Sequence, residues 1–316
     1  MKIAVVGAGL SGLAVTCLLS QVVPVGCQIV LFDEKGVGGG ASGAGAGMMH
    51  PFAGARSRLN WRGFEGMRAT ACYLEKYPEV IVQRGIFRPA QSAAQQADFV
   101  SCAEQFPEEA CLRSGGLWLP KGVVVDLPLY LSRLWERSFE AGVVFVHKRI
   151  ETREELKDFT VVILAVGGDF SPFRSLFPEG MCLKAVKGQL LELSWPDDQP
   201  PLEHAFNGAV YLVQAGKRVL LGATYEKEWL EETPNMVKAR EWLLPRGEAL
   251  LPGIQQMPIL GCRAGLRGVT PNHRPLIGRA DHPQETWLIG GMGSKGLLYH
   301  MLFGKELVQR MGFPIF

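Results

Sequence analysis

The stretch that most constrains the fold is IAVVGAGLSGLAV, residues 3–15, which places three glycines between an apolar strand pattern and an apolar helix pattern. Residues 3–6 form a short β-branched run that is typical of a strand buried on both faces. Gly7 permits a tight turn, Gly9 lets the backbone approach a pyrophosphate, and Gly12 lets helix and strand pack closely. Phosphates would bind at the unpaired amides and the positive end of the helix. The spacing predicts a strand, a turn and a helix that bind a dinucleotide.

An acidic position completes this pattern. A second apolar run, residues 28–32, ends in Asp33 and Glu34, about twenty residues after the glycines, where a carboxylate can accept from both ribose hydroxyls. We favour Asp33, because it directly follows the last apolar strand residue, whereas Glu34 is more typical of a solvated turn. The predicted adenine dinucleotide site therefore comprises Gly7, Ala8, Gly9, Leu10, Ser11, Gly12, Asp33 and Glu34.

Length and charge restrict the class of protein. The chain has 316 residues, which exceeds the usual single domain and suggests two. Hydrophobic residues make up 47% and charged residues 20%, as in a globular enzyme rather than a disordered chain. The formal net charge of +2 neither requires nor excludes a nucleic-acid partner.

Cysteine usage and the N-terminus indicate where such a protein works. Seven cysteines are scattered, with no CxxC and no Cys/His ligand spacing, so we expect reduced thiols, a cytoplasmic location and no metal site. Lys2 before an apolar run resembles a signal peptide, but the glycines lie inside that run and cleavage would destroy the phosphate site. No other stretch has the length of a transmembrane segment.

Residues 36–54, GVGGGASGAGAGMMHPFAG, are too rich in glycine and alanine for an ordinary surface loop. They fit either a flexible linker or a loop whose bare backbone lies against a flat ring and a diphosphate. With this loop after the glycine fingerprint and the acid, the chain resembles the D-amino-acid oxidase and glycine oxidase superfamily of flavoproteins. The resemblance implies that the loop runs along FAD and contacts it through Ala41, Ser42, Ala46, Gly47 and Met48.

The resemblance implies an α/β fold in which a Rossmann-type FAD-binding domain is interleaved with a smaller α+β substrate domain built on an antiparallel sheet. We expect residues 1–80, 120–183 and 262–316 in the FAD-binding domain, and residues 81–119 and 184–261 in the substrate domain. The patterns also predict helices over 56–77, 92–104, 127–141 and 234–251, the last two capped by Asp126 and Thr233, and strands over 83–89, 143–147, 161–168, 184–193, 209–213 and 218–225.

Two further stretches resemble flavin-binding motifs of the superfamily. VVILAVGG, residues 161–168, matches a strand whose end contacts the flavin through Ala165 and Gly167, although Val166 replaces a common threonine. GGMGSKGLLYH, residues 290–300, is a glycine turn opening the last helix, whose amides can point at the flavin N1 and C2 carbonyl. The implied contacts there are Gly293, Ser294, Lys295, Gly296 and Leu297.

Four side chains are candidates for work on the substrate. In CRAGLRGVT, residues 262–270, the resemblance implies that the fork of Arg267 binds a substrate carboxylate; the alternative is a surface arginine paired with an acid. Lys295, where the superfamily often has arginine, would neutralise reduced flavin or reach the carboxylate. Tyr211 and His50 each fit either a pocket residue or a structural one.

The resemblance also bears on the cofactor and the reaction. Gly265 stands where the sarcosine-oxidase branch has its flavin-linked cysteine, so FAD should be non-covalent. The resemblance implies oxidation of the C–N bond of a glycine-like or D-amino acid, by hydride transfer to flavin N5 and hydrolysis of the imine.

Two alternatives to a free amino-acid substrate stay open. GGLWLPKG, LGATYE and GMGSKGL resemble the FAD domain of a bacterial tRNA-modifying bifunctional enzyme, which makes the carboxymethylaminomethyl group of a tRNA wobble uridine the alternative substrate. Val166 and Lys295 are the features that would suit an FAD-bound scaffold without turnover.

Overall fold

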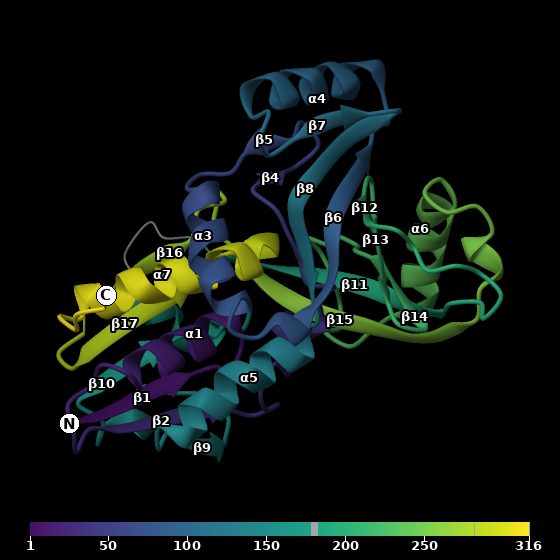
Figure 1. Cartoon of the computed structure of the whole chain (residues 1–316). Helices are drawn as coiled ribbons and strands as arrows, with labels where there is room; N and C mark the ends of the chain where they lie inside the picture. The colour runs from purple at the N-terminus through teal and green to yellow at the C-terminus, as the bar shows by residue number, and fades with distance from the viewer. Residues whose placement is uncertain (178–182, 281, 316) are drawn as a thin grey trace.

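The computed structural model describes residues 1–177, 183–280 and 282–315. Two sheets organise the chain, and Figure 1 shows that both termini lie beside the first of them. No helix in these residues is both long enough and apolar enough to cross a membrane.

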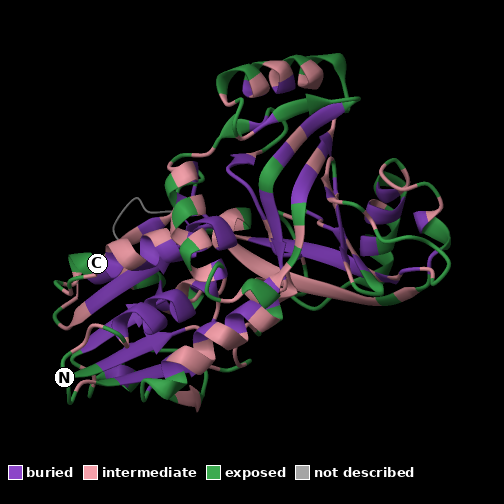
Figure 2. Cartoon of the chain, viewed as in Figure 1, coloured by how far each residue is buried: buried purple, intermediate pink, exposed green. Residues whose placement is uncertain are grey.

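The first sheet has the strand order β16-β17-β10-β1-β2-β9 and is parallel except for the edge strand β16. Its central strands are continuous apolar runs buried on both faces, as predicted for a parallel sheet covered by helices (Figure 2). The strands are β1 (Lys2–Val6), β2 (Gln28–Asp33), β9 (Val144–His147), β10 (Val161–Leu164), β16 (Leu276–Arg279) and β17 (Glu285–Gly290).

Helices pack beside this sheet and against one another (Figure 1). The helix α5 begins where predicted, because Asp126 Oδ1 accepts from the Leu129 amide at 3.0 Å and so satisfies a free helix donor. One face of α5 is buried against α1, and α7 packs between α1 and α3. The helices are α1 (Leu10–Leu19), α3 (Gly63–Leu74), α5 (Leu127–Glu140) and α7 (Gly296–Arg310).

The second sheet has the order β15-β11-β14-β13-β12-β6-β8-β3, with β7 beside β8. It is antiparallel except for β12 and β6, which are parallel and are joined by a long connection, as a parallel pair requires. The helix α6 (Met236–Glu248) packs against β11 and β14, and α4 (Ala93–Gln105) packs against β7 and β8. The strands are β3 (Met48–Met49), β6 (Ile81–Pro89), β7 (Cys111–Arg113), β8 (Gly116–Val125), β11 (Lys184–Ser194), β12 (Ala205–Asn207), β13 (Tyr211–Ala215), β14 (Arg218–Gly222) and β15 (Ile259–Val269).

Each sheet is assembled from segments that are far apart in the chain. The predicted domain boundaries at 120 and 262 fall inside β8 and β15, and both strands belong to the second sheet along their whole length. Residues 178–182, near the predicted boundary at 183, lie outside the described residues. We therefore propose domain limits that keep β8 and β15 intact.

Two predicted helices begin later than expected. The helix predicted from Arg56 begins at Gly63, because β4 (Phe52–Ala53) and β5 (Arg58–Leu59) pair as a short hairpin before it. The helix α6 is capped by Asn235, whose Oδ1 accepts from the Lys238 amide at 2.9 Å, and not by Thr233. The Thr233 carbonyl lies before the helix and accepts from Lys187 Nζ at 2.6 Å. Short elements outside the sheets and main helices are α2 (Ala41–Ala44) and the 3₁₀ helices η1 (Pro78–Val80), η2 (Glu154–Leu156), η3 (Ser171–Leu176), η4 (Ile254–Gln256) and η5 (Gly293–Lys295).

Candidate active site

The glycine turn between β1 and α1 leaves no room for side chains. A Cβ on Gly12 would lie 1.8 Å from the Gly7 carbonyl oxygen, and one on Gly7 would lie 2.5 Å from the Ala165 oxygen. Gly7 also has a φ of +105°, which favours glycine. A Cβ on Gly9 would lie 2.8 Å from Ser42 Oγ. The turn, the alanine-rich loop and the end of β10 thus meet at one point, as the three motifs predicted.

Asp33 lies against this turn. Its Oδ2 accepts from the Ala8 amide and its Oδ1 from the Lys35 amide, both at 2.8 Å. Each carboxylate oxygen retains a further acceptor site. Glu34 lies beside it and forms an ion pair with Arg149 at 2.9 Å. The structure therefore fixes the Asp33 carboxylate at the turn, whereas the Glu34 carboxylate is paired with Arg149.

A cavity of about 380 Å³ opens at the same place, between the strand ends of the first sheet and β15 of the second. Cavities of a few hundred cubic ångströms are typical of ligand sites. The residues from the predicted cofactor set that line it are Gly7, Gly9, Leu10, Ser11, Asp33, Glu34, Ala41, Ser42, Ala165 and Gly167.

The second glycine turn, at the start of α7, lies beside the first. Ser11 Oγ is 3.5 Å from Met292 Sδ, and a Cβ on Gly296 would lie 3.3 Å from Leu10 Cδ1. Gly47, which directly precedes β3, has a φ of +70° and would place a Cβ 1.8 Å from the Val125 oxygen at the end of β8. The structure thus brings both ends of the sequence together.

These features fit a dinucleotide. In the described chain, neither α1 nor α7 has a side-chain hydrogen bond from its own N-cap residue. Ser42 Oγ accepts from the Leu10 amide at 3.0 Å, which leaves the other first-turn N–H groups of α1, and those of α7, to an anion. The glycine turns let the backbone approach such a group closely, and Asp33 supplies a hydrogen-bond acceptor. The residues present therefore suit a pyrophosphate next to the turn and a ribose next to Asp33.

One face of the second sheet carries the candidate substrate residues. Directly paired residues of neighbouring antiparallel strands point to the same face. Asn207 pairs with Tyr211, Tyr211 with Gly222, and Gly222 with Leu190. Farther along β11, Gly188 pairs with Gly265 and Val186 with Arg267, so Arg267 shares this face.

Arg267 and Tyr211 lie over two glycines of this face. A Cβ on Gly188 would lie 2.3 Å from Arg267 Nη2, and one on Gly222 would lie 2.5 Å from the Tyr211 hydroxyl oxygen. Arg267 Nη1 donates to Ser294 Oγ at 3.3 Å, and among the described residues no carboxylate forms an ion pair with it. Burial raises the pKa of Tyr211 to about 12, with Arg267 opposing, so its hydroxyl keeps its proton. This face of the sheet thus carries two hydrogen-bond donors, the Tyr211 hydroxyl and the charged guanidinium of Arg267.

Lys295 is half-buried at the start of α7. Its Nζ donates to the His273 carbonyl oxygen at 3.1 Å, and burial lowers the pKa of its ammonium group. No carboxylate pairs with it in the part of the chain that the structure describes. Lys295 does not line the cavity at the glycine turns, and its predicted contact with flavin or substrate stays a prediction.

His50 is 9% exposed, and its Nε2 lies 2.7 Å from Asn207 Nδ2. Burial and the nearby Arg88 lower the pKa of His50 to about 3, so the ring is neutral. Because Asn207 Nδ2 can only donate, Nε2 accepts from it and the ring proton is on Nδ1. Arg88 is 3% exposed and donates to the Phe52 and Gly54 carbonyls and to Ser57 Oγ, at 2.6 to 2.8 Å.

Sequence reasoning missed Asn207 and Arg88. Each belongs to a contact between segments that are far apart in the chain, and neither lies in a recognisable motif. The one available signal was a charged residue at an inward position of the apolar strand over 83–89.

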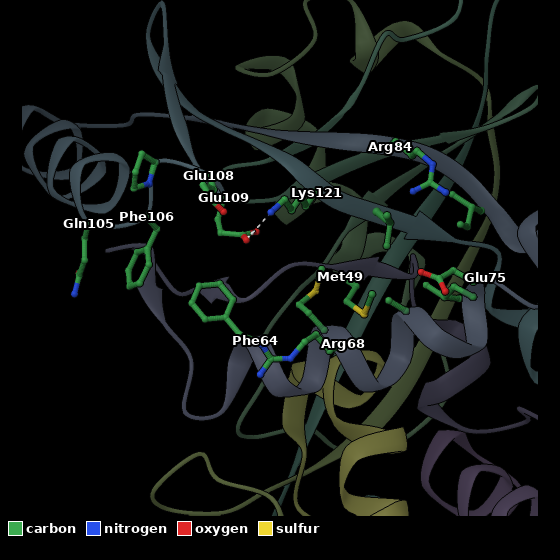
Figure 3. A pocket seen from close by; sticks show the side chains of 16 residues that line it. Met49, Phe64, Arg68, Glu75, Arg84, Gln105, Phe106, Glu108, Glu109 and Lys121 are labelled. Carbon is green, nitrogen blue, oxygen red and sulfur yellow. Dashed lines mark hydrogen bonds and ion pairs between the residues drawn. The ribbon is translucent and has the colours of Figure 1, made fainter. Parts of the chain in front are cut away.

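A larger cavity, of about 720 Å³, lies elsewhere (Figure 3). It lies between α3 and the strands β6 and β8, with Met49 and Phe64 among its apolar residues and the Glu109–Lys121 ion pair, at 2.7 Å, beside it. It shares none of its described lining residues with the cavity at the glycine turns, so the two cavities are distinct. The described residues contain no cluster of three or more His, Cys, Asp or Glu that could hold a metal.

Comparison with known proteins identifies the family. Residues 2–310 match the model of the family DAO, described as FAD dependent oxidoreductase. The chain belongs to this family. FAD is therefore the dinucleotide that the two glycine turns are suited to bind.

The DAO-family chain is similar to several known proteins. It is 26% identical to the tRNA 5-methylaminomethyl-2-thiouridine biosynthesis bifunctional protein MnmC of Maricaulis maris, over 98% of this chain and 52% of that protein. It is 32% identical to the glycine oxidase of Bacillus subtilis over 34% of this chain and 28% of that protein. The chain spans about half the length of the first of these relatives.

A solved structure shares the fold. The glycine oxidase of Geobacillus kaustophilus superimposes with a TM-score of 0.80 at 20% identity, covering 98% of this chain and 95% of that one. At this identity the likeness supports the fold alone, and it agrees with the predicted D-amino-acid oxidase-like architecture.

Proposed function

We propose that this DAO-family protein oxidises the C–N bond of an amine or amino acid that carries a carboxylate. The observation that supports this most is the position of Arg267. Its guanidinium lies over Gly188, on the same sheet face as the neutral hydroxyl of Tyr211, and has no carboxylate partner among the described residues. A rigid guanidinium fork binds a carboxylate through two parallel hydrogen bonds. We further propose that FAD is held non-covalently and that the protein is cytoplasmic.

The roles of the side chains follow from this arrangement. FAD, when bound, supplies a two-electron acceptor for the hydride that leaves the substrate α-carbon. Arg267 and Tyr211 hold the carboxylate end, which restricts the orientation of the neighbouring C–H bond. The uncapped amides of α7 provide positive potential next to the cofactor cradle. No side chain needs to remove a proton from a neutral amine in this proposal.

A second candidate substrate is the carboxymethylaminomethyl group of a tRNA wobble uridine. Its support is the similarity to MnmC, which extends over 98% of the chain, whereas the similarity to Bacillus subtilis glycine oxidase covers 34%. Both candidates place a carboxylate next to the amine that is oxidised. Arg267 therefore has the same role in each.

Anaerobic mixing of the FAD-loaded protein with substrates tests the proposal. Glycine, sarcosine and D-alanine form one set, and tRNA with or without the carboxymethylaminomethyl group forms the other. We expect loss of the flavin absorption band with at least one set, and weaker binding of that substrate to Arg267→Ala at unchanged FAD content. A spectrum that none of these compounds alters would contradict the proposal and would revive the scaffold alternative.

A further inference from the structure

Asn207 has hydrogen-bonding capacity that the protein does not use. Its Nδ2 donates one hydrogen to His50 Nε2 at 2.7 Å, which leaves a second N–H and the Oδ1 acceptor without a side-chain or backbone partner among the described residues. Its pairing with Tyr211 places it on the face that also carries Arg267. Asn207 is only partly buried, so these groups are within reach of a ligand.

The distance between Asn207 and Arg267 sets the size of a substrate that touches both. The Arg267 guanidinium lies over Gly188 on β11, and β14 and β13 separate β11 from β12. With about 4.8 Å between strands and an offset of two residues along β11, Gly188 and Asn207 lie about 16 Å apart. Two hydrogen bonds of about 3 Å leave about 10 Å for the ligand between its two recognised groups. Glycine spans only a fraction of that length.

We propose that Asn207 recognises an amide or imide group at the far end of the substrate, whose carboxylate is bound by Arg267. One free N–H donor beside one free carbonyl acceptor is complementary to a group that offers the same pair. The inference rests on the proposed oxidation of a carboxylated amine and narrows its substrate class. The uracil ring of a modified uridine has a carbonyl beside an N–H, so it belongs to this class, whereas glycine, sarcosine and D-alanine do not.

His50 is the positioning residue for this contact. His50 is buried and carries its proton on Nδ1, so its Nε2 lone pair accepts from Asn207 Nδ2 and holds the amide in one orientation. The remaining donor and acceptor of the amide are then directed outward. A protonated ring would donate from Nε2 and would require the amide to turn over. Arg88, buried close by and without an acidic partner among the described residues, opposes such protonation.

Two N-substituted glycines of the same shape separate this proposal from its alternatives. N-(2-carbamoylethyl)glycine ends in an amide, and N-(3-methylbutyl)glycine replaces that amide by an apolar group of equal size. Binding to the FAD-loaded protein is measured by isothermal titration calorimetry, which does not depend on turnover. We expect the wild type to bind the amide ligand about tenfold or more tightly, because the apolar ligand would cover the Asn207 amide without pairing it.

Three variants test whether the preference for the amide ligand depends on Asn207. In Asn207→Leu, which keeps the side-chain size, the ratio of the two affinities should fall to about one. In His50→Gln the ratio should fall partly, since glutamine can accept from the amide but is not rigid. Tyr211→Phe is the matched control: it should weaken both ligands equally and leave the ratio unchanged. The flavin spectrum and the thermal unfolding of each variant show that it is folded and loaded.

The outcomes distinguish this inference from the proposed function. Equal affinities in the wild type, or a preference that survives in Asn207→Leu, would overturn the role of Asn207. If the amide ligand binds preferentially but no carboxylated amine bleaches the flavin, the recognition by Asn207 stands and the proposed oxidation fails.

Discussion

Replacing Gly188 by alanine tests the position of the Arg267 guanidinium without changing the arginine itself. The added Cβ would lie 2.3 Å from Nη2 and 2.6 Å from Cζ, so the guanidinium must move by about 1.1 Å before Nη2 reaches an ordinary contact of 3.4 Å. The far end of an arginine side chain can make that shift, and the sheet does not need to change. We therefore expect a folded protein with a displaced fork.

The expected loss of substrate affinity in Gly188→Ala follows from hydrogen-bond geometry. A shift of about 1 Å takes a hydrogen bond of about 2.8 Å beyond useful length, and a bond to a charged group contributes about 1.5–3 kcal/mol. At 1.4 kcal/mol per tenfold, the dissociation constant of a carboxylated substrate should rise about 10- to 150-fold. The FAD content should not change, because Gly188 does not line the cofactor cavity.

The assay is anaerobic bleaching of the flavin band at increasing substrate concentration, which yields the dissociation constant and the limiting rate. Gly261→Ala is the control, since it lies on β15 and its added Cβ would meet Glu192 Oε2 at an ordinary 3.4 Å. Unchanged substrate binding in Gly188→Ala would refute the placement of Arg267 at the carboxylate. Loss of FAD from this variant would also contradict the reasoning.

Three further predictions concern the cofactor and pH. Gly12→Ala should abolish FAD binding, because its Cβ would lie 1.8 Å from the Gly7 oxygen; a yellow, FAD-loaded variant would refute the close approach. Acid precipitation should release FAD into the supernatant, and flavin retained in the pellet would show a covalent link. Burial lowers the pKa of His50 and His300 to about 3 from an ordinary 6.5, so the unfolded chain binds more protons below pH 6.5 and stability falls on acidification. Urea unfolding should show a loss of about 2 kcal/mol per histidine between pH 7 and 5, reduced in His300→Gln, and an unaltered pH dependence in that variant would contradict the assignment.

The residues of the cofactor site could be predicted from the sequence because the motifs that mark them are short and local. The glycine spacing lies within the first fifteen residues, where a side chain on Gly12 would meet the Gly7 carbonyl, and Asp33 follows at the end of the next strand. The close contact of Gly7 with Ala165 depends on the sheet and is not local. The α7 turn was predicted from its glycines together with its resemblance to a flavin-binding motif of the superfamily. That these segments lie together follows from a parallel sheet in which β1 and β10 are neighbours.

The substrate face could be predicted only in part. Arg267 and Tyr211 were predicted through resemblance, but Asn207 faces Tyr211 only because β12 and β13 pair in one register, and no local pattern fixes that register. The boundaries at 120 and 262 cut strands for the same reason, since membership of a sheet depends on partners distant in sequence. Thr233 fits a cap pattern as well as Asn235 does, and only the structure shows that Asn235 Oδ1 is the group that accepts from the Lys238 amide.

The central claim is that FAD lies between the two glycine turns at the starts of α1 and α7. The most direct test is the visible absorption spectrum of the gently purified protein, before and after addition of FAD and removal of the excess. The account predicts flavin bands in the protein fraction, and their disappearance in Gly12→Ala. A folded wild-type protein that stays colourless after incubation with FAD would contradict it.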